Sequence, residues 1–252
     1  MSSDFVDPTP NVAHRPWPLP KRPWMMTQRW SDLLFLHWPV PKDAMRALVP
    51  RNIDLDLWHD TAYVSVTPLW ISHLRLRGMP PLPWTSEFAE INVRTYVSVD
   101  GRGGVYFFSL DAARMLAVIG ARASFNLPYY HAQMSVRHSA SGSIDYESRR
   151  NEGERAATFS ATYAPVGPIT HAERNTLDHW LTERYCLYAV DSRGGVHRAE
   201  IHHDPWPLQS ARVVVRENTM TAAAGITLPD VAPRSSFARS LDVVVWNKER
   251  VR

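Results

Sequence analysis

Alternating apolar and polar residues along most of the chain predict a large antiparallel sheet. The clearest alternation covers residues 88–99 and stops at the glycine-rich segment 100–104, after which 105–110 follows as a second strand. Further strands are predicted over 62–68, 130–136, 144–150, 155–163, 185–190, 196–202, 211–216 and 241–246. Hairpins dominate and βαβ units are scarce, so we expect the α+β class.

Helical spacing is confined to three short segments. The residues from Pro39 to Asp43 open a helix that reaches about Leu48, and Ser109 or Asp111 can cap a second one over 112–125. A third is indicated by residues spaced i, i+3, i+4 and i+7, namely Leu177, Trp180, Leu181 and Arg184. Helices are therefore expected to be few.

The first 23 residues differ from the rest of the chain. They contain six prolines and lack the apolar core of a signal peptide, so we expect an extended arm. This arm is predicted to be mobile or to lie across a surface, that of a second subunit included. No repeat or break in composition follows, and residues 24–252 are predicted to form a single domain.

Composition narrows the function classes. Hydrophobic residues make up 44% and charged residues 21% of the chain, which is typical of a globular protein. The net charge is +3 and no run of basic residues exceeds two, so no nucleic-acid footprint is visible. Cys186 is the single cysteine, and no apolar stretch approaches the ~18 residues of a membrane span. We expect a cytoplasmic location and no membrane partner.

Six segments together resemble the uncharacterised YqjF-like family (DUF2071) of the acetoacetate decarboxylase-like superfamily. They are 36–40 (LHWPV), 88–97 (FAEINVRTYV), 107–112 (FFSLDA), 127–130 (LPYY), 183–185 (ERY) and 202–209 (HHDPWPLQ). The resemblance covers nearly the whole chain. It implies a curved, barrel-like antiparallel sheet that encloses a pocket, with a few outer helices.

Residues 121–130 (ARASFNLPYY) resemble the superfamily's catalytic segment, which reads approximately Gly-Arg-Glu-x-x-Gly-x-Pro-Lys-Lys. Arg122 and Pro128 match its arginine and proline, but the lysine pair is replaced by Tyr129 and Tyr130. In that segment a lysine with a lowered pKa forms a Schiff base. A phenol cannot form an imine, so the resemblance implies the fold without its best-known chemistry.

Three polar residues share one face of the 88–99 strand. Glu90 fits the superfamily's aromatic-x-Glu pattern and can act as an acid or base, while Arg94 can hold a carboxylate. Asn92 lies between them and is a further substrate-binding candidate. The alternative is a solvated strand face with an ordinary Glu–Arg pair, but strands that enclose a pocket must turn one face inward.

The remaining candidates come from the second half of the chain. Tyr129 alternates onto the polar side of its strand and could stabilise an oxyanion, although both it and Tyr130 could equally be packing residues. Arg122 points inward near Tyr129 in one interpretation and outward in the other. His202, in the sequence His-His-Asp, is a candidate base or orienting group. Metal-ligand and nucleotide-binding motifs are missing, so we expect no metal and no cofactor.

Three function classes remain. We favour an enzyme of the lyase or isomerase type that acts on a small carboxylate or carbonyl compound by acid–base chemistry without a Schiff-base lysine. The alternative is a non-catalytic protein that binds or senses a small ligand. A nucleic-acid-binding or purely structural role fits the dispersed charge least. The expected partner is an anionic or carbonyl-bearing small molecule, and a homo-oligomer is compatible with the sequence.

Overall fold

The computed structural model describes residues 11–79, 87–114, 126–151 and 155–252. Most of these residues belong to one sheet of 14 strands, accompanied in the described part by three short helices. The strands are β1 (Met26–Val40), β2 (Asp54–Leu55), β3 (Ala62–Leu76), β4 (Phe88–Val99), β5 (Arg102–Ala112), β6 (Tyr129–His131), β7 (Gln133–His138), β8 (Ile144–Arg150), β9 (Ala157–Thr170), β10 (Cys186–Val190), β11 (Val196–His202), β12 (Leu208–Asn218), β13 (Arg234–Val245) and β14 (Glu249–Arg250). The helices are α1 (Lys42–Leu48), α3 (Leu177–Thr182) and α4 (Met220–Ala223).

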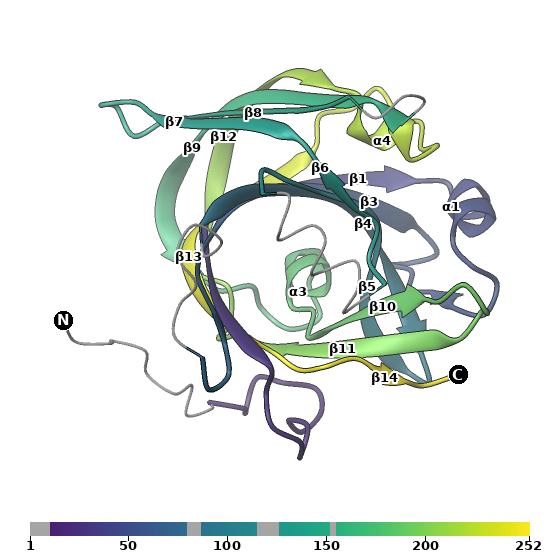
Figure 1. Ribbon diagram of the computed structural model, residues 1–252. Helices are drawn as coiled ribbons and strands as arrows, with labels where there is room; N and C mark the ends of the chain where they lie inside the picture. Colours follow the sequence, from purple (N-terminus) through teal and green to yellow (C-terminus); the bar gives the residue numbers. More distant parts are fainter. Residues whose placement is uncertain (1–10, 80–86, 115–125, 152–154) are drawn as a thin grey trace.

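Seven strands close into a ring. In the order β11, β10, β5, β4, β3, β1 and β13 each strand pairs with the next, and a short β11–β13 ladder, in which Ile201 pairs with Val245, joins the two ends (Figure 1). All of these pairings are antiparallel except that of β5 with β10. The α+β class with a curved, mainly antiparallel sheet is therefore confirmed.

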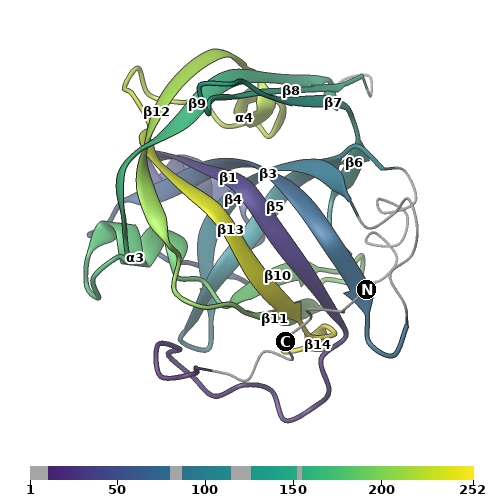
Figure 2. The ribbon, with the colours of Figure 1, turned by 90° about the vertical axis from the view of Figure 1, so that its left-hand side faces the viewer.

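A second layer covers the outer face of this ring. Strands β12, β9, β8 and β7 continue from β13 and curl over β1, β3 and β4 (Figure 2). The space between the layers is filled by apolar side chains such as Leu36, Ile91 and Phe159, all with no exposed surface. Their burial, at about 25 cal/mol per Å² of apolar area, holds the second layer on the ring.

The curvature of the long strands has local causes. Within β1, Asp32 has a φ of 51°, and the β1–β3 register shifts between Ser31 and Leu36. Within β3, His73 has a φ of 52° at a second irregularity of the same ladder. Such bulges bend a strand and increase its twist. They let β1 and β3 follow the ring rather than run straight across it.

Most predicted elements are confirmed. The strands over 88–99 and 105–110 correspond to β4 and β5, and the turn at Asp100 and Gly101 has the two positive φ angles of a type I′ turn. The α1 and α3 helices and the β10–β11 hairpin also lie where the sequence predicts them. The predicted helix over 112–125 falls largely outside the described residues, and its first residue, Ala112, belongs to β5.

One predicted strand was wrong in detail, and one long strand was not predicted. The predicted strand over 130–136 is divided at Ala132, because β6 pairs in parallel with β5 whereas β7 pairs with β8. The amide of Ala132 donates to the carbonyl of Ala112, which marks the point where the chain changes partners. The fifteen-residue β1 was not among the predicted strands. Leu33–Leu36 are buried consecutively, so the run does not alternate.

The described part of the N-terminal arm, residues 11–23, lies against the chain's own β11. Arg15 forms an ion pair with Glu200 at 3.1 Å, and the indole nitrogen of Trp17 donates to the same carboxylate. The side chain of Arg15 has no exposed surface. Of the two arrangements expected for the arm, this segment adopts the one laid across a surface. The boundary between the arm and a single domain over 24–252 stays a prediction.

Candidate functional site

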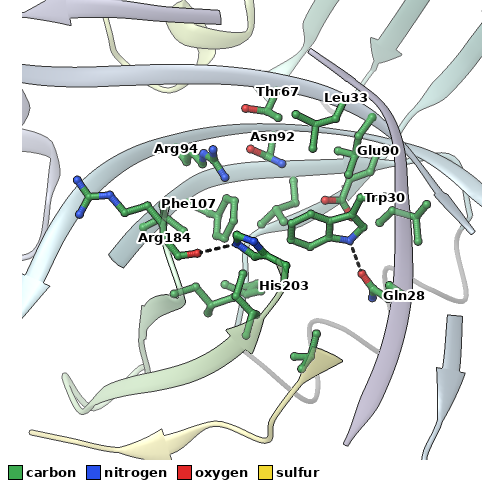
Figure 3. Close-up of a pocket in the computed structure, with 18 of the residues that line it drawn as sticks. Gln28, Trp30, Leu33, Thr67, Glu90, Asn92, Arg94, Phe107, Arg184 and His203 are labelled. Atoms are coloured by element: carbon green, nitrogen blue, oxygen red, sulfur yellow. Dashed lines mark hydrogen bonds between the residues drawn. The ribbon is translucent and has the colours of Figure 1, made fainter. Parts of the chain in front are cut away.

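The ring surrounds a cavity of about 430 Å³ that is partly open to solvent (Figure 3). Its lining comes from strands of the ring and from the segments beside them, and most of the lining side chains are apolar. The polar lining residues among those described are Gln28, Thr67, Glu90, Asn92, Arg94, Tyr129, Thr182, Arg184, Cys186 and His203. A mainly apolar cavity with a few polar groups is typical of a site for a small organic ligand.

Strand β4 supplies the central polar row of this cavity. Glu90, Asn92 and Arg94 alternate along it and all line the cavity, whereas Ile91 and Val93 are buried in the layer on the other face. The solvated-face alternative for these three residues does not hold, since each is less than one-tenth exposed. Period-two alternation in the sequence therefore located this part of the cavity wall.

Glu90 and Tyr129 form a hydrogen-bonded pair within the wall. The phenol donates to Oε2 of Glu90 at 2.9 Å. Burial raises the pKa of Glu90 to about 7; hydrogen bonds from Tyr129 and Asn92 oppose this rise, and the negative charge of Asp111 adds to it. Burial and the adjacent Glu90 raise the pKa of Tyr129 well above its ordinary value. Glu90 can therefore give or take a proton near neutral pH, while Tyr129 stays protonated as a donor.

Arg94 is a buried cation with no carboxylate partner among the described residues. Its Nε atom has no hydrogen-bond partner there, and its guanidinium lies over the Phe35 ring at 5.4 Å. Burial is the main cause that lowers the pKa of Arg94, and the nearby Arg184 lowers it further. An uncompensated buried charge is costly unless a counter-ion arrives. Arg94 is thus suited to receive an anion.

Arg184 is a second arginine of the lining, and the sequence did not mark it as a site residue. Its Nη1 atom forms an ion pair with Asp56, and its Nε donates to the carbonyl of Trp180 at 2.6 Å. Its Nη2 atom has no hydrogen-bond partner among the described residues. The positive charge of Arg184 is therefore already balanced by Asp56, unlike that of Arg94. Helical spacing predicted Arg184 as part of a helix, but α3 ends at Thr182 and Arg184 lies just after it. That spacing gave no indication that Arg184 lines a cavity.

The structure brings His203, not His202, to the cavity. His203 is buried in the lining, with Nδ1 2.7 Å from the carbonyl of Asp204, and burial lowers its pKa. His202 faces the N-terminal arm, where it stacks on His14 and approaches Arg15. Burial and then Arg15 lower the pKa of His202 to about 4. Because Ile201 lines the cavity, alternation along β11 could have singled out His203.

The two adjacent tyrosines take different environments. Tyr130 does not line the cavity; its ring lies 4.2 Å from the Arg150 guanidinium, and its hydroxyl accepts a hydrogen bond from Arg155. Alternation thus separates Tyr129, on the cavity side, from Tyr130, which packs between arginines. Arg122 lies outside the described residues, so neither orientation proposed for it is tested.

No lysine lines this cavity, so there is no described residue here that could form an imine. The chain's three lysines, Lys21, Lys42 and Lys248, all belong to the described residues, and none lines the cavity. Lys42 is half-exposed and pairs with Asp60. Within the described ranges, no group of three or more histidine, cysteine, aspartate or glutamate side chains is arranged to hold a metal ion. None of the described helices is long and apolar enough to cross a membrane.

Comparison with known proteins places the chain in a family. The model of DUF2071, a family of uncharacterized conserved proteins, matches residues 27–242. The chain belongs to this family. It is 45% identical over 223 residues to the uncharacterized protein YqjF of Bacillus subtilis, a match that spans 88% of this chain and 91% of YqjF. The predicted family is therefore confirmed.

Solved structures support the fold expectation. The enduracididine biosynthesis enzyme MppR, complexed with the condensation product of pyruvate and imidazole 4-carboxaldehyde, matches with a TM-score of 0.64 and 12% identity, over 91% of this chain and 90% of that one. An acetoacetate decarboxylase-like enzyme from Sphingomonas wittichii RW1 matches with a TM-score of 0.62 and 8% identity, over 92% and 94%. At these identities the likeness is one of fold alone, and it confirms the acetoacetate decarboxylase-like architecture.

Proposed function

We propose that this protein is an enzyme that moves a proton on a small carboxylate or carbonyl compound, in a lyase or isomerase type of reaction without an imine. The observation that carries the proposal is the buried Glu90–Tyr129 pair in a cavity that is also lined by Arg94, a cation without a carboxylate partner in the described part of the chain. Buried groups with pKa values moved toward neutrality are characteristic of catalytic sites. The fold relative MppR, complexed with a condensation product of pyruvate, supports a carbonyl acid as ligand class.

The proposed reaction uses three residues. Arg94 holds the carboxylate of the ligand, and the Glu90 carboxylate takes a proton from the carbon next to a carbonyl group. The electron pair moves onto the carbonyl oxygen. As Glu90 becomes protonated it no longer needs the Tyr129 hydrogen bond, and the single Tyr129 O–H turns to donate to the developing oxyanion. Protonated Glu90 then returns the proton to the same or another carbon. Tyr129 does not ionise in this cycle, because its pKa is raised well above the ordinary value.

Hydrogen–deuterium exchange tests this chemistry directly. A keto acid whose carbonyl group lies several bonds from its carboxylate, such as 5-oxohexanoate, is dissolved in D₂O. The NMR signal of the protons next to its carbonyl group should disappear faster when the protein is added. Glu90→Gln should reduce this catalysed exchange by about 10²-fold or more. The matched control is Glu147→Gln, because Glu147 is about half-exposed on β8. Equal exchange rates for the wild type and Glu90→Gln would refute the role of Glu90.

Borohydride reduction tests the absence of an imine. With the same keto acid, mass spectrometry should find no adduct on Lys21, Lys42 or Lys248, since none of them lines the cavity. A stoichiometric adduct on any of these lysines would overturn the proposed mechanism.

A non-catalytic binding or sensing role is the second candidate. The mainly apolar lining favours it, because such a wall supplies affinity without contributing to proton transfer. Saturable ligand binding that depends on Arg94, together with no exchange above the solvent rate across the neutral pH range, would select this role over the enzyme.

A further inference from the structure

The polarity of the cavity wall changes along β4 and along the strands paired with it, as their register shows. Along β4 and its partner β3, Arg94 pairs with Ser65, Asn92 with Thr67, Glu90 with Leu69 and Phe88 with Ile71. The direction continues on β1 and β3, where Ile71 pairs with Trp30 and Leu76 with Met26. The cavity wall therefore passes from a cation, through an amide and a carboxyl, to an apolar end. Figure 3 shows this order for Arg94, Asn92, Glu90 and Trp30.

Additional apolar side chains line the far end, beside the amide side chain of Gln28. Ile201 pairs with Val245, which in turn pairs with Met26, and all three line the cavity. Leu74 and Leu76 line it from β3. No charged residue lies in the described lining beyond Glu90 in this direction. Apart from the Gln28 amide, a ligand that fills this end therefore meets side chains that favour hydrocarbon.

The length and volume of the cavity exceed those of a three-carbon acid. Arg94 and Glu90 are four residues apart on a strand, which corresponds to about 13 Å between their Cα atoms. They form no ion pair with each other in the described structure. The cavity volume of about 430 Å³ corresponds to about fourteen liquid-water volumes. A three-carbon acid such as pyruvate would leave most of this space unfilled.

The charges at the Arg94 end of the cavity fit a ligand that carries one negative charge. Arg94 and Arg184 each contribute one positive charge, and Asp56 neutralises Arg184 through their ion pair. Among the described lining residues, the positive charge of Arg94 is the one left without a carboxylate partner. A second anionic group on the ligand would face either Glu90 or the apolar end, and burial there would penalise it.

We propose that the ligand is an amphipathic monocarboxylate of about twelve to fifteen non-hydrogen atoms, sized to the water-equivalent volume of the cavity. Its carboxylate lies at Arg94, an oxygen function several bonds away lies at Glu90 and Tyr129, and its hydrocarbon tail points toward Leu76 and Met26. The inference rests on the proposed function for the role of Arg94 as anchor, and it adds the ligand class and its orientation.

Calorimetric titration with hexanoate, octanoate, decanoate and decanedioate tests the inference without turnover. Affinity should increase about fourfold with each added methylene that is buried, until the cavity is full. Decanedioate should bind at least about tenfold more weakly than decanoate, because its second carboxylate would enter the apolar end. Equal affinities of hexanoate and decanoate for the wild type would overturn the inference, as would tighter binding of decanedioate.

Three variants locate the two ends of the ligand. Leu76→Glu should remove most of the gain between hexanoate and decanoate, and the matched control Val214→Glu, at a residue 60% exposed, should leave it intact. Arg94→Met should weaken all the monocarboxylates by about tenfold or more. Unchanged binding to Arg94→Met would overturn the orientation. If Leu76→Glu does not fold, the wild-type series still decides.

The proposed ligand class and the proposed acid–base chemistry can be refuted independently of each other. Loss of the chain-length gain with intact Glu90-dependent exchange refutes the ligand class and leaves the acid–base chemistry. A full chain-length gain without any catalysed exchange supports the ligand class and refutes the enzyme.

Discussion

Replacing Glu90 by glutamine should stabilise the protein at neutral and alkaline pH. Glu90 is 5% exposed, and burial raises its pKa in the folded state from its usual 4.5 to about 7. The folded protein therefore binds a proton at Glu90 more tightly than the unfolded chain does. Between these two pKa values stability falls as the pH rises, because the unfolded state ionises first. Glutamine resembles the protonated form and carries no such penalty.

The magnitude follows from the two pKa values. At about 1.36 kcal/mol per pKa unit, a rise from 4.5 to about 7 amounts to roughly 3 kcal/mol. The full stability is present below pH 4.5 and is lost as the pH rises through about 7. Glu90→Gln should thus have a free energy of unfolding higher than that of the wild type by up to roughly 3 kcal/mol at about pH 8, with little difference at about pH 5.

Urea denaturation at several pH values from about 5 to about 8.5 measures this effect, since other groups titrate equally in both proteins. The difference between wild type and Glu90→Gln should grow with pH and level off above about pH 7.5. Glu147→Gln, at an exposed carboxylate, should give a curve parallel to that of the wild type. A constant difference between Glu90→Gln and wild type across the range would refute the raised pKa and, with it, the physical basis for Glu90 as a proton carrier.

Two further predictions concern neighbouring groups. Tyr129→Phe removes a hydrogen bond that lowers the pKa of Glu90, so the midpoint of the pH–rate profile for exchange should move to higher pH; an unchanged midpoint would exclude the pair from the reaction. Asp111→Asn should lower the free energy of unfolding by about 3–5 kcal/mol, because it leaves Arg150 buried without its charged partner. Asp242→Asn, in an exposed pair with Arg29, should lower the free energy of unfolding by less than about 1 kcal/mol. Similar losses for the two would contradict the burial argument.

The parts of the fold that the sequence predicted are those held by local rules. The β4–β5 hairpin follows from period-two alternation and from the positive φ angles that Asp100 and Gly101 adopt at its turn. The β1 strand was missed because its central residues are buried on both faces, so neither period appears. The change of partner at Ala132 depends on a hydrogen bond to Ala112, a contact between distant segments that no local pattern encodes.

The candidate site likewise contains residues that local sequence patterns could predict and residues that they could not. Glu90, Asn92 and Arg94 could be predicted because one strand carries all three on one face. The link between Tyr129 and Glu90 depends on the parallel pairing of β6 with β5, in which Tyr129 lies beside Leu110. Sequence alternation could select Tyr129 over Tyr130, but not the residue it would contact. Arg184 reaches the cavity from the segment after α3, which helical periodicity alone could not indicate.

The energetic cost of this cavity is itself an argument for function. A carboxyl with a pKa near 7 and a buried guanidinium without a carboxylate partner among the described residues both reduce stability. An ion pair between Glu90 and Arg94 would reduce that cost, yet the wall keeps them four residues apart with Asn92 between them. Folds retain such destabilising groups where they meet a ligand, because stability is exchanged there for binding or catalysis. The separation of Glu90 from Arg94 therefore fits a molecule that lies between them and contacts both.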